Sequence, residues 1–153
     1  MKILLFNTLL IWTVGLFAQQ TDYAKLRPTV MVMTCGALDS GIVNTSLRNL
    51  LALDTSGIKK NMYMYYEDLG QCYWLKSGGE EGSYYLKLSI ATTRKALYHN
   101  PESSKALWNL AFAHTMNGEC DMGKSYMEKY KLATKKKYWD EEQIRLLFER
   151  CSI

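Results

Sequence analysis

The sequence predicts an all-α protein in which antiparallel helix pairs stack side by side and a C-terminal helix closes the stack. Two observations lead to this prediction. A helical pattern of large and small residues occurs twice, 41 residues apart, and each copy is followed by a turn and a second helical pattern. With 48% apolar and 22% charged residues, the composition is that of an ordinary globular domain.

The first 18 residues have the features of a secretory signal peptide. Met1-Lys2 supplies positive charge, an apolar run extends from Ile3 to Phe17, and Ala18 stands just before polarity returns. The run is shorter than the roughly 20 apolar residues of a membrane-spanning helix. We therefore expect cleavage near Ala18, export to the periplasm or out of the cell, and no membrane insertion of the mature chain. A retained membrane helix is the alternative.

The charge distribution gives no indication of a nucleic-acid partner. The formal net charge of +4 is modest for 153 residues. The basic residues concentrate late in the chain, at Lys124, Lys129, Lys131, Lys135, Lys136 and Lys137. We interpret this basic run as a solvated helix face or helix end, and an anionic partner is the alternative.

The repeated pattern is the observation on which the fold prediction depends. Its positions i, i+3, i+4 and i+7 lie on one face of a helix. The two copies are Tyr66, Leu69, Gly70 and Tyr73, and then Leu107, Leu110, Ala111 and His114. The small residue at the third position lets another helix approach closely, so each copy predicts the first helix of a packed pair.

A turn and a second helix are expected after each copy. In the first pair a glycine-rich turn at 77–82 precedes a face that ends at Asn100-Pro101, where proline disfavours further helix. In the second pair Asn117-Gly118 forms the turn. The partner helices are marked by Leu86, Ser89, Ile90, Thr93, Ala96 and Leu97, and by Cys120, Gly123, Met127 and Tyr130.

These two pairs resemble the tetratricopeptide repeat (TPR) family, whose 34-residue unit is a helix-turn-helix. Other positions that match the family pattern are Ser89, Ala96, Pro101, Asn109, Gly118 and Gly123. The departures from it are Thr93, His114 and Tyr130. The offset of 41 residues exceeds the family's unit by seven residues, which we place in the Gly78–Gly82 turn.

The resemblance implies a stack with end pieces, because one helical hairpin cannot bury its own apolar face. The expected segments are the signal peptide (1–18), a degenerate N-terminal hairpin (19–58), two TPR-like repeats (59–103 and 104–137) and a C-terminal capping helix (138–153). In the N-terminal hairpin we expect helices at Pro28–Leu38 and Gly41–Leu53. The β-branched residues at 29–34 leave an extended strand as an alternative over 29–38.

The C-terminal helix is expected to begin after Asp140, whose side chain suits a helix N-cap. Glu141 and Glu142 then complement the positive end of the helix dipole. The apolar positions i, i+3, i+4 and i+7 of this helix are Ile144, Leu147, Phe148 and Cys151.

The chain shows no pattern typical of catalysis, metal binding or a cofactor, so we predict a non-enzymatic protein with none of them. The two histidines have simpler roles: His114 falls on the core stripe, and His99 lies near a helix C-terminus. The four cysteines, Cys35, Cys72, Cys120 and Cys151, lack the close spacing of zinc or redox motifs.

Disulfides are the natural role for cysteines in an exported protein. In a stack of antiparallel helices, the start of the helix at Cys120 and the end of the capping helix at Cys151 lie at the same edge. We therefore expect a Cys120–Cys151 bond, with Cys35–Cys72 as the remaining pair. Buried free thiols are the alternative.

The resemblance also implies a groove, lined by the first helices of successive repeats, that binds a protein or peptide. By register, its residues are Met64, Glu67, Gln71, Trp74, Lys105, Trp108, Asn109, Phe112 and Met116. Since exposed aromatic groups supply contact area at low entropic cost, this set favours protein binding. If the groove is open, replacing Trp108 and Phe112 by alanine abolishes binding and hardly alters stability.

Three alternatives to an open groove remain. The N-terminal segment or a neighbouring copy could cover it, and the latter would make the chain a self-associating structural subunit. A small envelope enzyme or thiol-redox protein with an unpaired cysteine is the alternative from another class. Recognition of chaperone tails is not expected, because Glu67 and Gln71 stand where that clamp of the TPR family uses lysine and asparagine.

Overall fold

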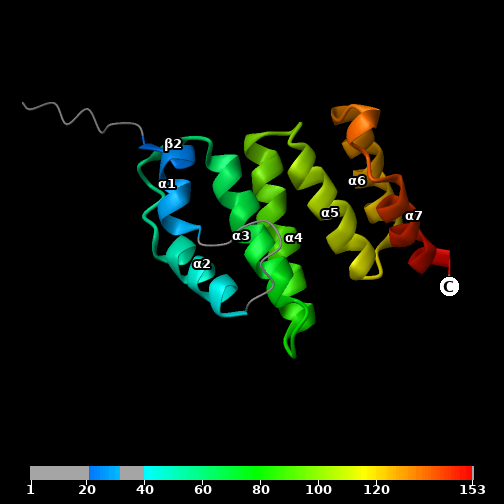
Figure 1. The fold of residues 1–153 in the computed structure, drawn as a ribbon, viewed down its shortest axis with the longest axis horizontal. Coiled ribbons are helices and arrows are strands. Elements are labelled where there is room, and N and C mark those ends of the chain that lie inside the picture. The colour runs from blue at the N-terminus through cyan, green and yellow to red at the C-terminus, as the bar shows by residue number, and fades with distance from the viewer. Residues whose placement is uncertain (1–20, 32–39, 153) are drawn as a thin grey trace, which may run out of the picture.

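A computed structural model describes residues 21–31 and 40–152 of the chain, and it confirms the all-α prediction (Figure 1). The predicted signal peptide and Cys35 lie outside these residues. The α-helices are α1 (Tyr23–Val30), α2 (Ser40–Ala52), α3 (Met62–Lys76), α4 (Gly82–His99), α5 (Ser104–Met116), α6 (Cys120–Ala133) and α7 (Glu141–Glu149). Short 3-10 turns follow α6 and α7, at Lys136–Tyr138 and Arg150–Ser152.

From α1 to α6 the helices form a row in which each packs on the next in sequence. Contacts join α2 to α3, α3 to α4, α4 to α5 and α5 to α6, and short turns make the members of each pair antiparallel (Figure 1). Alternate helices touch as well: α1 contacts α3, α3 contacts α5, and α5 contacts α7. One side of the row is therefore built from α1, α3, α5 and α7.

The first helix differs from the expected Pro28–Leu38. It runs over Tyr23–Val30, because the Asp22 carboxylate accepts a hydrogen bond from the Ala24 amide at 2.9 Å and so caps a helix that begins earlier. Pro28 lies inside this helix rather than at its start. The helix ends at Val30, and Met31 is extended. The rest of the predicted range, 32–38, lies outside the described residues.

A small parallel pair of strands was not predicted. It joins β1 (Thr21–Asp22) to β2 (Ile58–Lys60), just before α3. Asn61, in the left-handed conformation with φ of 55°, donates from Nδ2 to the Asp22 Oδ1 at 2.7 Å. This contact ties the start of α1 to the start of α3.

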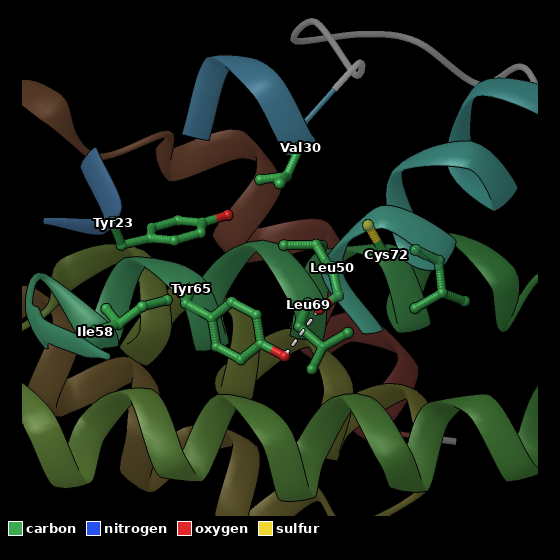
Figure 2. Packing of buried hydrophobic residues seen from close by; sticks show 8 residues of the cluster. Tyr23, Val30, Leu50, Ile58, Tyr65, Leu69 and Cys72 are labelled. Atoms are coloured by element: carbon green, nitrogen blue, oxygen red, sulfur yellow. Dashed lines mark hydrogen bonds between the residues drawn. The ribbon is translucent and has the colours of Figure 1, made fainter. Parts of the chain in front are cut away.

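The N-terminal core lies between α1, α2 and α3 (Figure 2). Its buried side chains are Tyr23, Val30, Leu47, Leu50, Ile58, Tyr65, Leu69 and Cys72. The hydroxyl of Tyr65 donates to the backbone carbonyl of Leu50 at 3.2 Å, so this buried polar group has a partner. Two further clusters follow along the row, one around Leu86, Ile90 and Leu110 and one around Leu107, Met127 and Leu147.

Both helix pairs approach closely at a glycine. In the first pair Gly70 of α3 faces α4, where the Ser89 hydroxyl donates to the Gly70 carbonyl at 2.8 Å. In the second pair the glycine is on the other helix: Gly123 of α6 faces Ala111 and Thr115 of α5. A side chain at either glycine would meet the partner helix, so the missing Cβ sets the separation of the axes.

The placement of all seven extra residues in the Gly78–Gly82 turn was wrong. The turn between α3 and α4 covers 77–81, only two residues more than the turn at 117–119. Most of the additional chain is helical and lengthens the start of α4. The ring of Tyr85 stacks on that of Tyr73 with centroids 6.2 Å apart, which holds this added turn of α4 against α3.

The predicted disulfide Cys120–Cys151 is present, with Cα atoms 5.8 Å apart. It joins the start of α6 to the chain just after α7. The Asp140 side chain caps α7 by accepting from the Gln143 amide at 2.9 Å, as expected, and Leu147 is buried against α5 and α6. Within 21–31 and 40–152, none of the helices has both the length and the apolar character that a membrane crossing requires.

The two glycines are expected to tolerate alanine differently. At Gly123 a new Cβ would lie 3.1 Å from the Ala111 carbonyl oxygen and 3.2 Å from the Thr115 amide, and backbone cannot move aside. Gly123→Ala should therefore lower the free energy of unfolding by about 1–3 kcal/mol. At Gly70 the closest atom is the Thr93 hydroxyl oxygen and the nearest backbone atoms are 3.5 Å away, and alanine adds about 1 kcal/mol of helix propensity, so Gly70→Ala should cost clearly less stability than Gly123→Ala. Urea denaturation of both variants checks this, and equal losses would contradict it.

Loss of the disulfide should loosen the C-terminal end of the row. For a separation of 31 residues, loop-closure entropy predicts a loss of about 3–4 kcal/mol in the double variant Cys120→Ser/Cys151→Ser. Thermal denaturation of oxidised wild type and variant measures the difference. Hydrogen exchange should show the largest loss of protection in α7, and unchanged exchange there would oppose this account.

Candidate functional site

A groove runs along the side of the row formed by α3, α5 and α7. One cavity of about 190 Å³ is lined by Gln71, Trp74, Lys105, Trp108, Asn109, Phe112 and Gln143. A second, of about 320 Å³, is lined by Trp74, Phe112, Met116, Gln143, Leu146, Leu147 and Arg150. Because both share Trp74, Phe112 and Gln143, they form one continuous surface, here called the α3–α5–α7 groove.

Helical spacing explains why these side chains converge. Gln71 and Trp74 are three residues apart on α3. On α5 the lining residues recur at intervals of three or four, which keeps them on one face, and the same spacing applies to α7. Since alternate helices touch, the three faces lie next to one another and each contributes a strip of the groove.

Seven of the nine residues predicted for the groove line its cavities: Gln71, Trp74, Lys105, Trp108, Asn109, Phe112 and Met116. The other two do not. Met64 packs against the N-terminal core, and Glu67 is only 6% exposed and accepts a hydrogen bond from Ser103. At the start of α3, neighbouring elements therefore cover a helix face that the repeat pattern of the sequence predicted to be exposed in the groove.

The contribution of α7 was missed. Gln143, Leu146 and Arg150 line the groove, whereas the sequence indicated α7 only as a cap. The available signal was a second stripe at i, i+3 and i+7, beside the apolar stripe that packs on the core. It is recognisable once α7 is placed next to α5.

The aromatic residues of the groove have different structural roles. Trp108 lies against Phe112 and Tyr130, with ring centroids 4.9 and 5.0 Å away, and it packs with Phe112 against the C-terminal core. Their truncation is therefore expected to lower stability, contrary to the expectation from the sequence. Trp74 is 39% exposed and belongs to none of the core clusters found in the described residues. It is the better probe of the groove.

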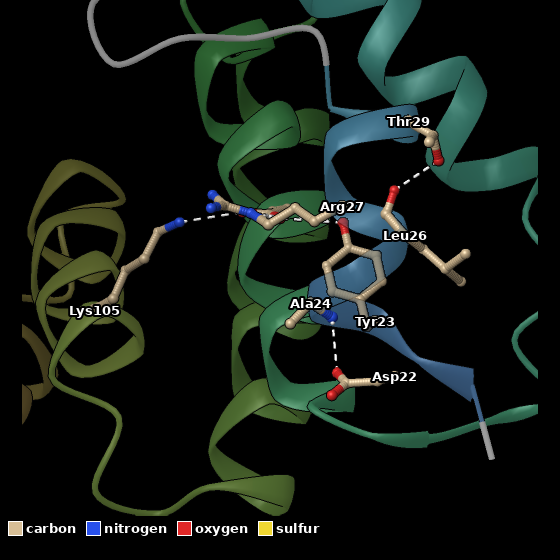
Figure 3. Close-up of polar contacts among 8 residues, drawn as sticks. Asp22, Tyr23, Ala24, Leu26, Arg27, Thr29 and Lys105 are labelled. Carbon is tan, nitrogen blue, oxygen red and sulfur yellow. Dashed lines mark hydrogen bonds and ion pairs between the residues drawn. The ribbon is translucent and has the colours of Figure 1, made fainter.

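A buried carboxylate beside the groove joins three helices. Asp68 of α3 is 1% exposed and accepts from Arg27 of α1 at 2.6 Å (Nε) and 3.0 Å (Nη2). The Tyr23 hydroxyl donates to it at 3.1 Å, and Lys105 of α5 at 3.2 Å. Figure 3 shows Tyr23, Arg27 and Lys105 reaching toward this point from both sides.

This network sets the local electrostatics. Burial, together with the adjacent carboxylate, raises the pKa of Tyr23 well above its ordinary value, and the hydrogen bond to Asp68 raises the pKa of Arg27. Both groups therefore keep their protons near neutral pH. Since Arg27 and Lys105 remain partly exposed, the network presents positive charge to solvent while its negative charge is buried.

The two histidines lie in different surroundings. His114 is 1% exposed; its Nδ1 is bonded to the Glu119 carboxylate, and its Nε2 lies 3.4 Å from Nη2 of Arg94. The hydrogen bond from His114 lowers the pKa of Glu119. His99 is on the surface, stacked on the Tyr66 ring with centroids 5.4 Å apart. The role of His114 is to join the start of α6 to α5.

Cys72 does not fit the thiol-redox alternative. It is a free thiol, fully buried in the N-terminal core, and burial raises its pKa to about 12. A thiol in this environment is neither ionised nor accessible. Its expected partner, Cys35, lies outside the described part of the chain. Among the residues that are described, no group of three His, Cys, Asp or Glu side chains is suited to hold a metal ion.

Comparison with models of protein families, with curated proteins and with solved structures finds no match for this chain.

The buried Glu67 gives a prediction for pH dependence. Burial raises its pKa above the ordinary 4.5, against the effect of the Ser103 hydrogen bond, so the ionised side chain opposes folding. This penalty is absent below the unfolded pKa and develops as the pH rises through the folded pKa. Glu67→Gln, whose amide oxygen still accepts from Ser103, should raise the free energy of unfolding near neutral pH and flatten its pH dependence.

Denaturation at several pH values measures the effect. Glu128→Gln, at an exposed position of α6, is the control and should leave the pH profile unchanged. A Glu67→Gln protein less stable than wild type at neutral pH would show that the carboxylate charge is needed.

Proposed function

We propose that this chain is an exported, non-enzymatic adaptor or assembly subunit of the TPR kind, which holds a segment of another protein in the α3–α5–α7 groove. The arrangement of the helices supports the TPR relationship. Each pair meets at a small residue, α3 and α4 first and α5 and α6 second, and alternate helices share one side of the row. In a TPR stack the first helices of successive units line the ligand groove in this way.

The observation that carries the proposal is the composition of the groove. Each of its three helices contributes an amide side chain, namely Gln71, Asn109 and Gln143, beside the exposed ring of Trp74. An amide can donate to and accept from a peptide backbone at once. The two cavities, about 190 and 320 Å³, share Trp74, Phe112 and Gln143, and linked cavities of this kind suit successive side chains of an extended peptide.

Export is supported by two features. The N-terminal sequence is typical of a signal peptide, and the Cys120–Cys151 bond is compatible with an oxidising compartment. The mature protein would then act in the periplasm or outside the cell.

The function is tested by removing Trp74. Trp74→Ala should weaken partner capture by about tenfold or more, because an exposed ring at the centre of an interface supplies much of the binding energy. Its melting temperature should stay close to that of wild type, since the ring is not part of the core. Tyr98→Ala is the matched control, because it removes an aromatic ring that is 85% exposed on α4, away from the groove.

The partner is identified by placing a photo-cross-linking amino acid at Gln143 in the protein expressed with its export signal. Cross-linked products are then analysed by mass spectrometry. A second protein, lost with Trp74→Ala and retained with Tyr98→Ala, is the expected result. Cross-linking to a further copy of this chain would favour self-association instead, and cross-linking unaffected by Trp74→Ala would exclude the groove as the binding site.

A further inference from the structure

We propose that the ligand of the α3–α5–α7 groove is an acidic peptide segment, with an apolar side chain seated between Trp74 and Phe112 and carboxylates on both sides of it. This inference rests on the proposed function and specifies the chemistry of the partner. It comes from the distribution of charge along the groove.

Positive charge stands at both ends of the groove. Lys105 lines the first cavity and Arg150 the second, and none of the described residues that line either cavity is an aspartate or glutamate. Lys105 is 38% exposed on its side chain, and Arg150 is exposed. A ligand in the groove therefore meets a cation at each end.

Of the acidic groups near Lys105, Asp140 lines a neighbouring cavity and caps α7, while Asp68 and Glu67 are buried and do not cancel the charge of Lys105 for a ligand. Asp68 is 1% exposed, and Arg27 makes two hydrogen bonds to it in addition to that from Lys105, so two cations surround one buried anion. Glu67 is also buried, and burial raises its pKa. At the other end, the Nη1 of Arg150 lies 3.0 Å from the sulfur of Met116, a neutral and weak acceptor. Both cations can still bind a carboxylate.

Between the two cations the groove is apolar. Trp74 and Phe112 belong to both cavities, and Met116 and Leu146, each about half exposed, continue the apolar surface. A nucleic-acid duplex or an anionic membrane would require continuous positive charge and would leave this surface unpaired. A peptide with an apolar side chain between two carboxylates matches both the apolar middle of the groove and the cations at its ends. The amides of Gln71, Asn109 and Gln143 can form hydrogen bonds with the backbone of this peptide.

The test begins with selection from a phage library of random peptides on the purified protein. The expected peptides carry Asp or Glu on both sides of a Leu, Phe or Trp. A selected peptide and its counterpart with Asn and Gln in place of the acids are then measured by titration calorimetry. The acidic peptide should bind about tenfold or more tightly than its counterpart at low salt, and the advantage should shrink as salt is added.

Variants assign the effect to the two cations. Lys105→Gln/Arg150→Gln should weaken the acidic peptide by about tenfold or more and leave the neutral counterpart nearly unchanged. The matched control is Lys135→Gln/Lys137→Gln, which removes the same charge from the basic run after α6 and should change neither affinity. If loss of the Lys105–Asp68 contact unfolds the double variant, Arg150→Gln alone should still weaken the acidic peptide several-fold.

The outcomes separate the two proposals. Selected peptides without acidic enrichment, or an acidic peptide equally weakened by both double variants, would overturn the inference while groove binding stands. Peptides that bind Trp74→Ala as well as wild type would overturn groove binding, and the inference with it.

Discussion

The backbone of α3 meets α4 at Gly70, and that of α6 meets α5 at Gly123, because neither position has a side chain to hold the helices apart. Close approach lets the two helices of each pair pack together, and stacking of the pairs then buries the apolar face that one hairpin would leave exposed. The other helices pack around these two pairs: α2 contacts α3, α4 contacts α5, and α7 contacts α5. At the C-terminal end the disulfide holds this arrangement covalently.

The groove is a consequence of this packing. Residues of α3, α5 and α7 that point away from their own pair partner share one side of the row, and their side chains meet across the contacts of alternate helices. The Asp68 network adds a polar tie among α1, α3 and α5 beside the groove. A buried carboxylate is costly unless it is fully paired, and here Tyr23, Arg27 and Lys105 pair it. The same contacts that satisfy Asp68 hold Lys105 at the mouth of the groove.

The groove side chains fall into two kinds, and the distinction matters for function. Trp108 and Phe112 pack against the C-terminal core and also line the groove. Their loss would therefore change both the stability of the protein and the shape of the groove. Trp74, the three amides and Arg150 belong to none of the core clusters in the described residues, and Lys105 both pairs Asp68 and lines the groove. In the proposed function these are the residues that a partner contacts.

The sequence by itself determined the helices of both pairs, the close approach at Gly70, the Asp140 cap and the Cys120–Cys151 bond, because each depends on local periodicity or on the antiparallel order of neighbouring helices. It also placed most of α3 and α5 correctly along the groove. Only the tertiary structure decided that Glu67 and Met64 are covered, that α7 and the turn after it supply Gln143 and Arg150, and that Arg27 and Lys105 share Asp68. These contacts join residues far apart in the chain. Helical spacing shows which side chains share a face of one helix, but not what lies opposite that face.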